Sequence, residues 1–128
     1  ADAGCDAVQI LIEIIRGTAH GLTREDVLLG CPVNNLAQEM SPVDEDFRLR
    51  IETLFNEWRM ATGAALRRAQ QHGAIAPGID VQASAAFIVA SLEGCIGMAK
   101  NGQSKETLLM CGEGLISYLQ SLNNQSEC

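Results

Sequence analysis

The sequence predicts an all-α fold, a helical bundle of about five helices in one domain at residues 1–122, with a polar tail at 123–128. Apolar residues recur at helical spacing through most of the chain. Residues that favour helix N-caps stand just before several of these apolar stretches. Once the helices are assigned, no segment is left as a strand candidate.

The composition argues against several classes of protein. The formal net charge is −7, whereas a surface that grips nucleic-acid phosphates needs clustered Lys and Arg. The five cysteines form no CxxC motif, which argues against a disulfide framework and against a zinc site. We therefore expect no metal and no cofactor. No apolar run reaches the length of a membrane span and no signal peptide is visible, so we expect a cytoplasmic protein without a membrane partner.

The first predicted helix covers residues 3–16 and ends at Gly17. Its length favours a helix over a strand, although the segment is rich in isoleucine. Residues 17–29 are expected to form a loop that begins to turn helically at Thr23. The apolar face of the helix consists of Val8, Leu11, Ile12 and Ile15, widened by Ile10 and Ile14.

Two further helices are predicted in the middle of the chain. The turn Gly30-Cys31-Pro32 leads into a short helix at 33–40, because Pro suits the first helical position. Three consecutive acids, 44–46, then open a long helix that runs to His72, because acids stabilise the positive end of a helix dipole. Its predicted buried stripe is Phe47, Ile51, Leu54, Phe55, Trp58, Ala61 or Thr62, Ala65 and Ala69.

The last two predicted helices form a hairpin. Asp80 caps the first, which is apolar on nearly all sides from residue 81 to 100, and Gly102 is expected to end it in the left-handed conformation. Ser104 caps the second, residues 105–122.

This hairpin has more apolar surface than one small domain needs, and small residues recur along it at helical spacing. We therefore predict a homodimer that forms through these two helices as a four-helix bundle. The predicted interface residues are Ala83, Ala86, Ala90, Gly94, Gly97, Leu108, Cys111, Leu115, Tyr118, Leu119 and Leu122.

Four segments carry a resemblance to a known family. They are Gly30-Cys31-Pro32-Val33-Asn34-Asn35-Leu36-Ala37, Phe55-Asn56-Glu57-Trp58-Arg59, Ala69-Gln70-Gln71-His72-Gly73-Ala74-Ile75 and Ser91-Leu92-Glu93-Gly94. In order and spacing, from about Cys5 to Leu122, the chain resembles the C-terminal domain of TetR/AcrR-type transcriptional regulators.

The resemblance implies a helical domain that binds an effector and dimerises, in a regulator that is most often a repressor. In that family an N-terminal helix-turn-helix domain binds operator DNA. Such a domain is absent from this sequence, and Ala1 would stand in the middle of a longer protein. Operator DNA would then be bound only through the missing domain.

An effector cavity is expected where the long helix, the short helix after Pro32 and the helix from Val81 converge. Its predicted lining is mostly apolar, so we expect a small hydrophobic or aromatic effector. The aromatic side chains are either core or part of the cavity wall, and the hydroxyls bond either a ligand or the carbonyl one turn back. The arginine is either solvated or turned inward to select an anion. The candidate ligand-binding residues are Leu54, Phe55, Trp58, Arg59, Thr62, Ser91 and Cys95.

Two further side chains leave alternatives open. Glu93 is an acid within an apolar helix, so it is either bonded to a loop N–H or an Arg, or it contacts a ligand. Cys31 before a helix start is either a packing residue or a redox sensor. Cys95 and Cys111 are expected to be small hydrophobic residues. No nucleophile, base and orienting group occur together, so we expect no enzyme; a plain dimerisation module with a filled core remains an alternative.

Overall fold

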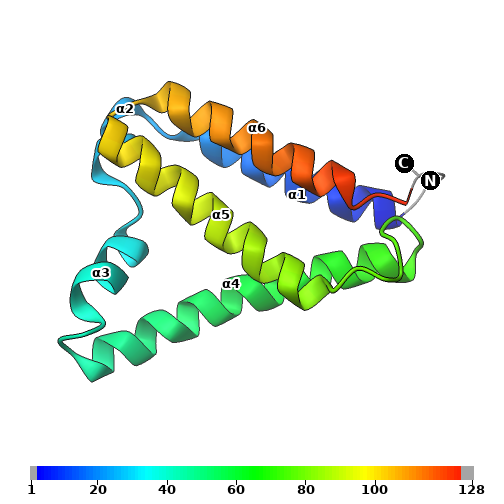
Figure 1. Ribbon diagram of the computed structural model, residues 1–128, viewed down its shortest axis with the longest axis horizontal. Coiled ribbons are helices and arrows are strands. Elements are labelled where there is room, and N and C mark those ends of the chain that lie inside the picture. The colour runs from blue at the N-terminus through cyan, green and yellow to red at the C-terminus, as the bar shows by residue number, and fades with distance from the viewer. Residues whose placement is uncertain (1–2, 125–128) are drawn as a thin grey trace.

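The computed structural model describes residues 3–124 and has the predicted all-α class. The helices form an elongated bundle in which the start of α1 and the end of α6 lie at the same end (Figure 1). The six helices of the described residues are α1 (Ala3–Gly21), α2 (Arg24–Leu29), α3 (Pro32–Met40), α4 (Glu45–Gln71), α5 (Val81–Gly102) and α6 (Lys105–Ser121).

Side-chain caps fix the starts of four helices. Asp44, Asp80 and Ser104 each accept a backbone N–H from the first turn of the helix that follows, which confirms the predicted starts of α4, α5 and α6. Thr23 forms a reciprocal capping box with Asp26, so the helical turn expected at Thr23 is the start of α2.

Two predicted helix ends are wrong by a few residues. Helix α1 continues through Gly17 to Gly21, because Ala19 extends its buried face and packs against α6. Tertiary packing here outweighs the low helix propensity of glycine. At the end of α5, Gly102 is still helical and the left-handed residue is Gln103, with φ 51°, because the helical hydrogen bonds run one residue further than the glycine suggests.

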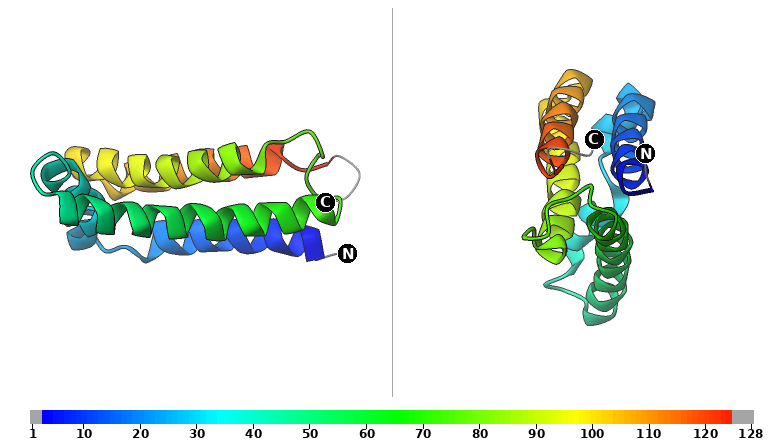
Figure 2. Two further views of the ribbon diagram at one scale, coloured as in Figure 1. Left: turned by 90° about the horizontal axis from the view of Figure 1, so that it is seen from below. Right: turned by 90° about the vertical axis from the view of Figure 1, so that its right-hand side faces the viewer.

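The helices form two layers, one of α1 and α4 and the other of α5 and α6 (Figure 2). Helix α1 packs against α4 and α6, and α5 packs against the same two helices. The core between the layers includes Leu66, Ala69, Ala85 and Leu119, all fully buried. We call this region, made of α1, α2, α5, α6 and the second half of α4, the packed bundle.

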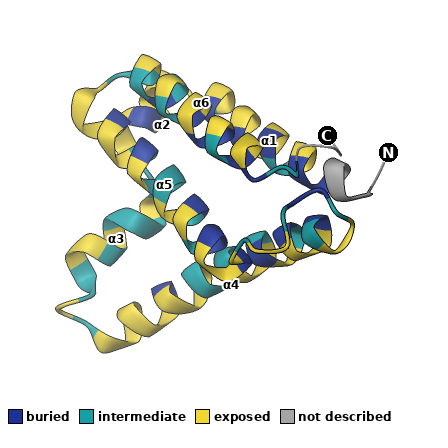
Figure 3. Ribbon diagram, turned by 45° about the vertical axis from the view of Figure 1, so that its right-hand side comes forward, coloured by how far each residue is buried: buried dark blue, intermediate teal, exposed yellow. Residues whose placement is uncertain are grey.

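The first half of α4 diverges from α5 and, with α3, forms an open arm, residues 32–58 (Figures 1 and 3). Helix α3 has no buried residue, and Ile51 is the single buried residue in the α4 part of the arm. The predicted stripe of α4 is therefore wrong in this half, where Phe47 and Leu54 are exposed. Among the described residues, the helices leave Phe47 and Leu54 of α4 partly open to solvent, whereas the second half of α4 packs closely on α5 through Gly63 and Leu66.

The predicted face of α1 is narrower than expected. Val8, Ile12 and Ile15 are buried in the core, but Ile10 and Ile14 are more than half exposed. Helix α4 and helix α6 cover only one side of α1. The two outer isoleucines thus lie at the edge of the packed face.

The loop between α4 and α5 is held by bonds that the sequence did not indicate. The Gln70 side-chain amide donates to the carbonyls of Ala76 and Ile79 at 3.0 and 2.9 Å. The Asn124 N–H donates to the Ala74 carbonyl at 2.7 Å. The start of the predicted tail, at 123–124, is therefore paired with this loop, and its other residues, 125–128, lie outside the described part.

Helices α5 and α6 are joined by a disulfide between Cys95 and Cys111, whose Cα atoms are 5.5 Å apart. The expectation that these two were simple hydrophobic residues is therefore wrong. Antiparallel packing brings the two thiols together across 16 residues of sequence, and no spacing rule indicates such a pair.

One sequence expectation about membranes also needs correction. Helix α5 is long and apolar enough, by length and composition alone, to cross a membrane. In the structure it packs against α4 and α6, and a core helix of a soluble protein passes the same test.

Candidate functional site

Two cavities adjoin along one face of α5. The first, of about 490 Å³, lies between α3, α4 and α5, and the second, of about 340 Å³, lies between α1, α4 and α5. Val89 and Glu93 of α5 line both. The first cavity occupies the place that the sequence predicted, at the junction of the open arm and the packed bundle.

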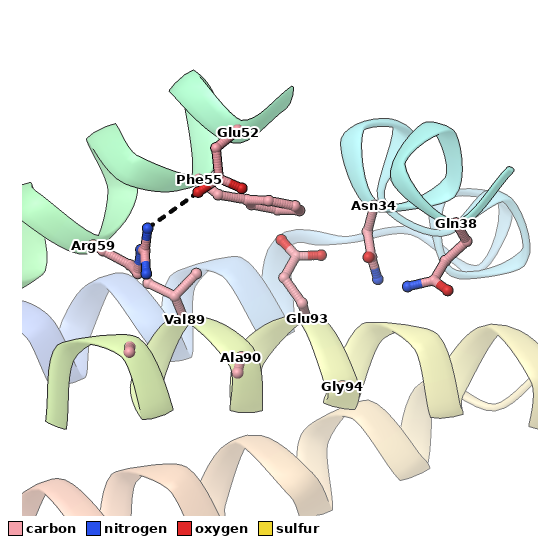
Figure 4. Close-up of a pocket in the computed structure, with 10 residues that line it drawn as sticks. Asn34, Gln38, Glu52, Phe55, Arg59, Val89, Ala90, Glu93 and Gly94 are labelled. Carbon is pink, nitrogen blue, oxygen red and sulfur yellow. Dashed lines mark hydrogen bonds and ion pairs between the residues drawn. The ribbon is translucent and has the colours of Figure 1, made fainter. Parts of the chain in front are cut away.

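The first cavity has a mixed lining, more polar than expected. Amide side chains of α3 face carboxylate, guanidinium and aromatic groups of α4 across the surface of α5 (Figure 4). Small residues of α5 form the floor. The lining residues are Asn34, Gln38, Glu52, Phe55, Arg59, Ala86, Val89, Ala90, Glu93 and Gly94.

Arg59 lines this cavity, but its charge is already paired. Its Nη2 donates to Glu52 Oε1 at 3.3 Å, the contact drawn as a dashed line in Figure 4, and to Asn56 Oδ1. Arg59 and Glu52 thus form a neutral pair within the cavity wall. The guanidinium is half-buried and is not free to select an anion by charge alone.

Glu93 has one oxygen without a partner. Its Oε1 accepts a weak bond from the Cys31 thiol, at 3.5 Å between Sγ and Oε1, and its Oε2 is buried with no hydrogen-bond partner among the described residues. Burial raises the pKa of Glu93 above its usual range, and the thiol contact offsets part of that rise. The expected loop N–H or arginine partner is absent here, because Arg59 bonds to Glu52 instead.

The second cavity is almost wholly apolar. Trp58 and Thr62 line it, together with Glu93 and side chains of α1 and α5. The Thr62 hydroxyl donates to the Trp58 carbonyl at 2.8 Å, which is the bond one turn back that the sequence left open. Trp58 also contacts Phe55 edge to face, with ring centroids 5.6 Å apart, so aromatic surface extends from one cavity to the other.

The structure distributes the predicted ligand-binding residues over three places. Phe55 and Arg59 line the first cavity, and Trp58 and Thr62 the second. Ser91 and Cys95 line a groove on the opposite side of α5, toward α6. Each lies two residues from Glu93, which corresponds to a rotation of about 200° around the helix axis, or about 160° in the other direction.

Leu54 is absent from the lining of both cavities. Sequence reasoning missed Asn34, Gln38 and Glu52 as wall residues. The available signal was helical spacing. Asn34 and Gln38 are four residues apart and so share one face of the predicted short helix. Glu52 and Phe55 are three residues apart and likewise share one face of the long helix.

Comparisons with known proteins decide the family. A family described as "Transcriptional regulator LmrA/YxaF-like, C-terminal domain" matches residues 7–114. The chain belongs to this family. It is a TetR-type C-terminal domain.

One curated relative is the "Transcriptional regulator AcuR" of Cereibacter sphaeroides, 33% identical over 85 residues. The match covers 66% of this chain and 39% of that protein. No solved structure matches the chain.

Cys31 of this TetR-type domain lies in an environment that raises the pKa of its thiol. Burial raises the pKa of the Cys31 thiol above its ordinary value, and the Glu93 carboxylate raises it further, although N–H groups at the start of α3 act in the other direction. A thiol with a raised pKa is a poorer nucleophile at neutral pH. In the part of the chain that the structure describes, no group of three His, Cys, Asp or Glu side chains could hold a metal ion.

The predicted dimer residues also separate into two groups. Leu108, Leu115, Leu119 and Leu122 lie in the chain's own core, because α6 turns its leucine stripe toward α1 and α5. The others are exposed or half-buried: Ala83, Ala90, Gly94 and Gly97 are exposed on α5, and Ala86, Cys111 and Tyr118 are half-buried. Of these, Ala86, Ala90 and Gly94 also border the first cavity.

Large apolar side chains surround the exposed small residues. Phe87, Met98 and Met110 are 52%, 64% and 72% exposed. A Cβ added at Gly94 or at Gly114 would meet no atom within 4 Å. We call this surface, the outer side of α5 and α6 around Phe87, Gly94, Met98, Met110 and Gly114, the outer face.

Proposed function

We propose that this chain is the effector-binding and dimerisation domain of a TetR-type repressor, and that it controls DNA binding by an N-terminal helix-turn-helix domain. The observation that carries the proposal is the pair of adjoining cavities that meet at Glu93 on α5. Cavities of 340–490 Å³ suit a small molecule. A plain dimerisation module with a filled core would have no use for them.

The effector in this proposal is a small hydrophobic or aromatic molecule. The second cavity offers it apolar side chains of α1, α4 and α5, and the first offers a few polar groups that can orient it. Such a lining, mostly apolar with few polar groups, is typical of small-molecule sites. The effector would contact both α5 and the open arm.

Dimerisation in the proposal uses the outer face. Exposed apolar side chains beside glycines with free space are what a closely packed helix interface requires. A second copy of the chain would cover this face and bury more than about 2,000 Å² in total, as obligate dimers do. Helix α5 would then contact the effector on the side that lines the two cavities and the partner subunit on the outer face.

Regulation would follow from a population shift. An effector changes the separation of the two DNA-binding domains only as far as it prefers the conformation that does not bind operator DNA. Because α5 borders both cavities and the outer face, a movement of α5 would reach the partner directly. The protein would act in the cytoplasm, without a membrane partner or a cofactor.

The test of the proposal is effector binding in the two cavities. Trp58 is the only tryptophan, so its fluorescence during titration with small aromatic compounds reports the second cavity directly. Val89→Phe fills the shared wall and should abolish the signal, whereas Val43→Phe, at an exposed position of the arm, should not. Equal binding by both variants would exclude these cavities.

The chain alone is expected not to bind duplex DNA at physiological salt. Its formal net charge of −7 gives no basic surface for phosphates. An electrophoretic mobility shift with a 30-base-pair duplex, on the order of the operator lengths that such dimers span, checks this. A salt-sensitive shift by the chain alone would contradict it.

A further inference from the structure

The charges around the two cavities do not balance. On α4, Glu52 and Arg59 neutralise each other. On α5, Glu93 has the neutral Cys31 thiol as its single hydrogen-bond partner among the described residues, and the lining residues that α1 contributes carry no charge. Lys100, two turns further along α5, is exposed and donates to Asn35. When Glu93 is ionised, the joined cavities therefore hold one uncompensated negative charge.

That charge has a free and buried acceptor. Glu93 Oε2 is shielded from solvent and has no hydrogen-bond partner among the described residues. A buried carboxylate oxygen without a donor is costly, and a donor supplied by a ligand removes that cost. Figure 4 shows the carboxylate pointing away from α5 into the space between Phe55 and the α3 amides.

Aromatic and apolar groups surround this acceptor. Phe55 lies on one side of Glu93 in the first cavity, and Trp58 lines the second cavity that Glu93 also borders. Aromatic rings attract cations as well as apolar groups. An anionic ligand would instead meet the field of Glu93, with Arg59 already engaged.

We infer that the effector is an amine, with a protonated nitrogen that binds Glu93 Oε2 and an aromatic or aliphatic body in the cavity beside Trp58. This inference rests on the proposed function and specifies the chemical class of the effector. It also replaces the aromatic acid that an unpaired, inward Arg59 would have favoured. The Asn34 and Gln38 amides are placed to bond further polar groups of the ligand.

The experiment compares three ligands with one body and different charge: 2-phenylethylamine, 2-phenylethanol and 3-phenylpropionate. Dissociation constants are measured by Trp58 fluorescence and by calorimetry at neutral pH. We expect the amine to bind about tenfold or more tightly than the alcohol, as a hydrogen bond to a charged group predicts, and the acid to bind most weakly.

Two matched variants test whether Glu93 causes the preference for the amine over the alcohol. Glu93→Gln keeps the shape and removes the charge, so the amine should lose its advantage while the alcohol binds as before. Glu57→Gln, at an exposed position of α4, should leave all three constants unchanged. Circular dichroism of each variant confirms that the fold is retained.

The possible failures are distinct. If 3-phenylpropionate binds as tightly as the amine, or if Glu93→Gln keeps the amine preference, the inference is overturned while the effector cavity stands. If none of the three ligands binds to the wild-type chain, both the cavity proposal and the inference are overturned.

Discussion

The packed bundle and the open arm share one helix, α4, yet the two halves of that helix are held in different ways. In the packed bundle, Leu66 and Ala69 are fully covered by the other layer. In the open arm, Phe47 and Leu54 are exposed and α3 contributes no buried residue. The comparison shows that close packing and the opening to the first cavity belong to different parts of one helix.

The largest expected effect is the difference between a buried leucine of the packed bundle and an exposed leucine of the open arm. Leu66→Ala should lower the free energy of unfolding by about 3 kcal/mol, because it leaves a cavity in a fully packed site. Leu54→Ala should cost less than about 1 kcal/mol, because that side chain is 37% exposed. Urea denaturation measures both, and equal losses would show that the arm is as well packed as the bundle.

The next effect concerns the outer face of the packed bundle. Gly94→Leu should weaken the dimer by about 1–3 kcal/mol, because it adds bulk to a close interface. Its Cβ meets nothing within the chain, so the fold should be kept. Gly17→Leu, in equally open space on α1, is the matched control and should leave the dimer intact. Light scattering over a concentration series decides, and a monomer for the wild-type chain at micromolar concentration would exclude this interface.

The two aspartate caps provide a smaller test of the same comparison. Asp80→Ala removes two N-cap bonds of α5 in the packed bundle and should lower the free energy of global unfolding by about 1 kcal/mol. Asp44→Ala removes the cap of α4 in the arm. It should speed amide hydrogen exchange in the first turns of α4 with little change in global stability, because the arm opens locally. If Asp44→Ala lowered global stability as much as Asp80→Ala, the two regions would unfold as one cooperative unit.

The smallest expected effect is the pH dependence at Glu93, where the two regions meet. Burial raises the pKa of Glu93 in the folded chain above 4.5, its ordinary value, so the folded state binds the proton more tightly than the unfolded state. The resulting stability is present below pH 4.5 and is lost as the pH rises through the raised pKa. The groups that face Glu93 are Cys31 from the start of α3 and the Glu52–Arg59 pair of α4.

Glu93→Gln should therefore gain stability relative to the wild type as the pH rises from about 4 to 7. Thermal unfolding in a series of buffers measures this gain. Glu57→Gln, at an exposed position, supplies the control. A difference between Glu93→Gln and wild type that stays constant across this pH range would show that Glu93 is not destabilised by ionisation.

The positions at which α4, α5 and α6 begin could be predicted from the sequence, because helix starts depend on groups that are close in sequence. Asp80 and Ser104 cap the helices that they were expected to cap, Asp44 caps the helix that the acids 44–46 were expected to open, and these bonds span only two or three residues. Local signals also placed the first cavity at the junction of α3, α4 and α5. The family resemblance added the expectation that the junction would be open.

Contacts between distant segments could not be predicted in the same way. The Cys31–Glu93 contact spans 62 residues, and the Cys95–Cys111 disulfide depends on how α5 and α6 rotate against each other. Because α5 is apolar on nearly all sides, its composition does not show which side faces a cavity. This is why Ser91 and Cys95 were assigned to the wrong side of α5 relative to Glu93.

The absence of buried side chains in α3 has a kinetic consequence. Moving α3 away from α4 uncovers no buried side chain of α3 itself, so a ligand bound as proposed could enter and leave through a local opening rather than by separation of the packed bundle. Substitutions on the α3 surface that faces α4, at positions other than the cavity residues Asn34 and Gln38, should then change the association and dissociation rate constants by the same factor. The dissociation constant would stay as it is, while the residence time of the ligand would change.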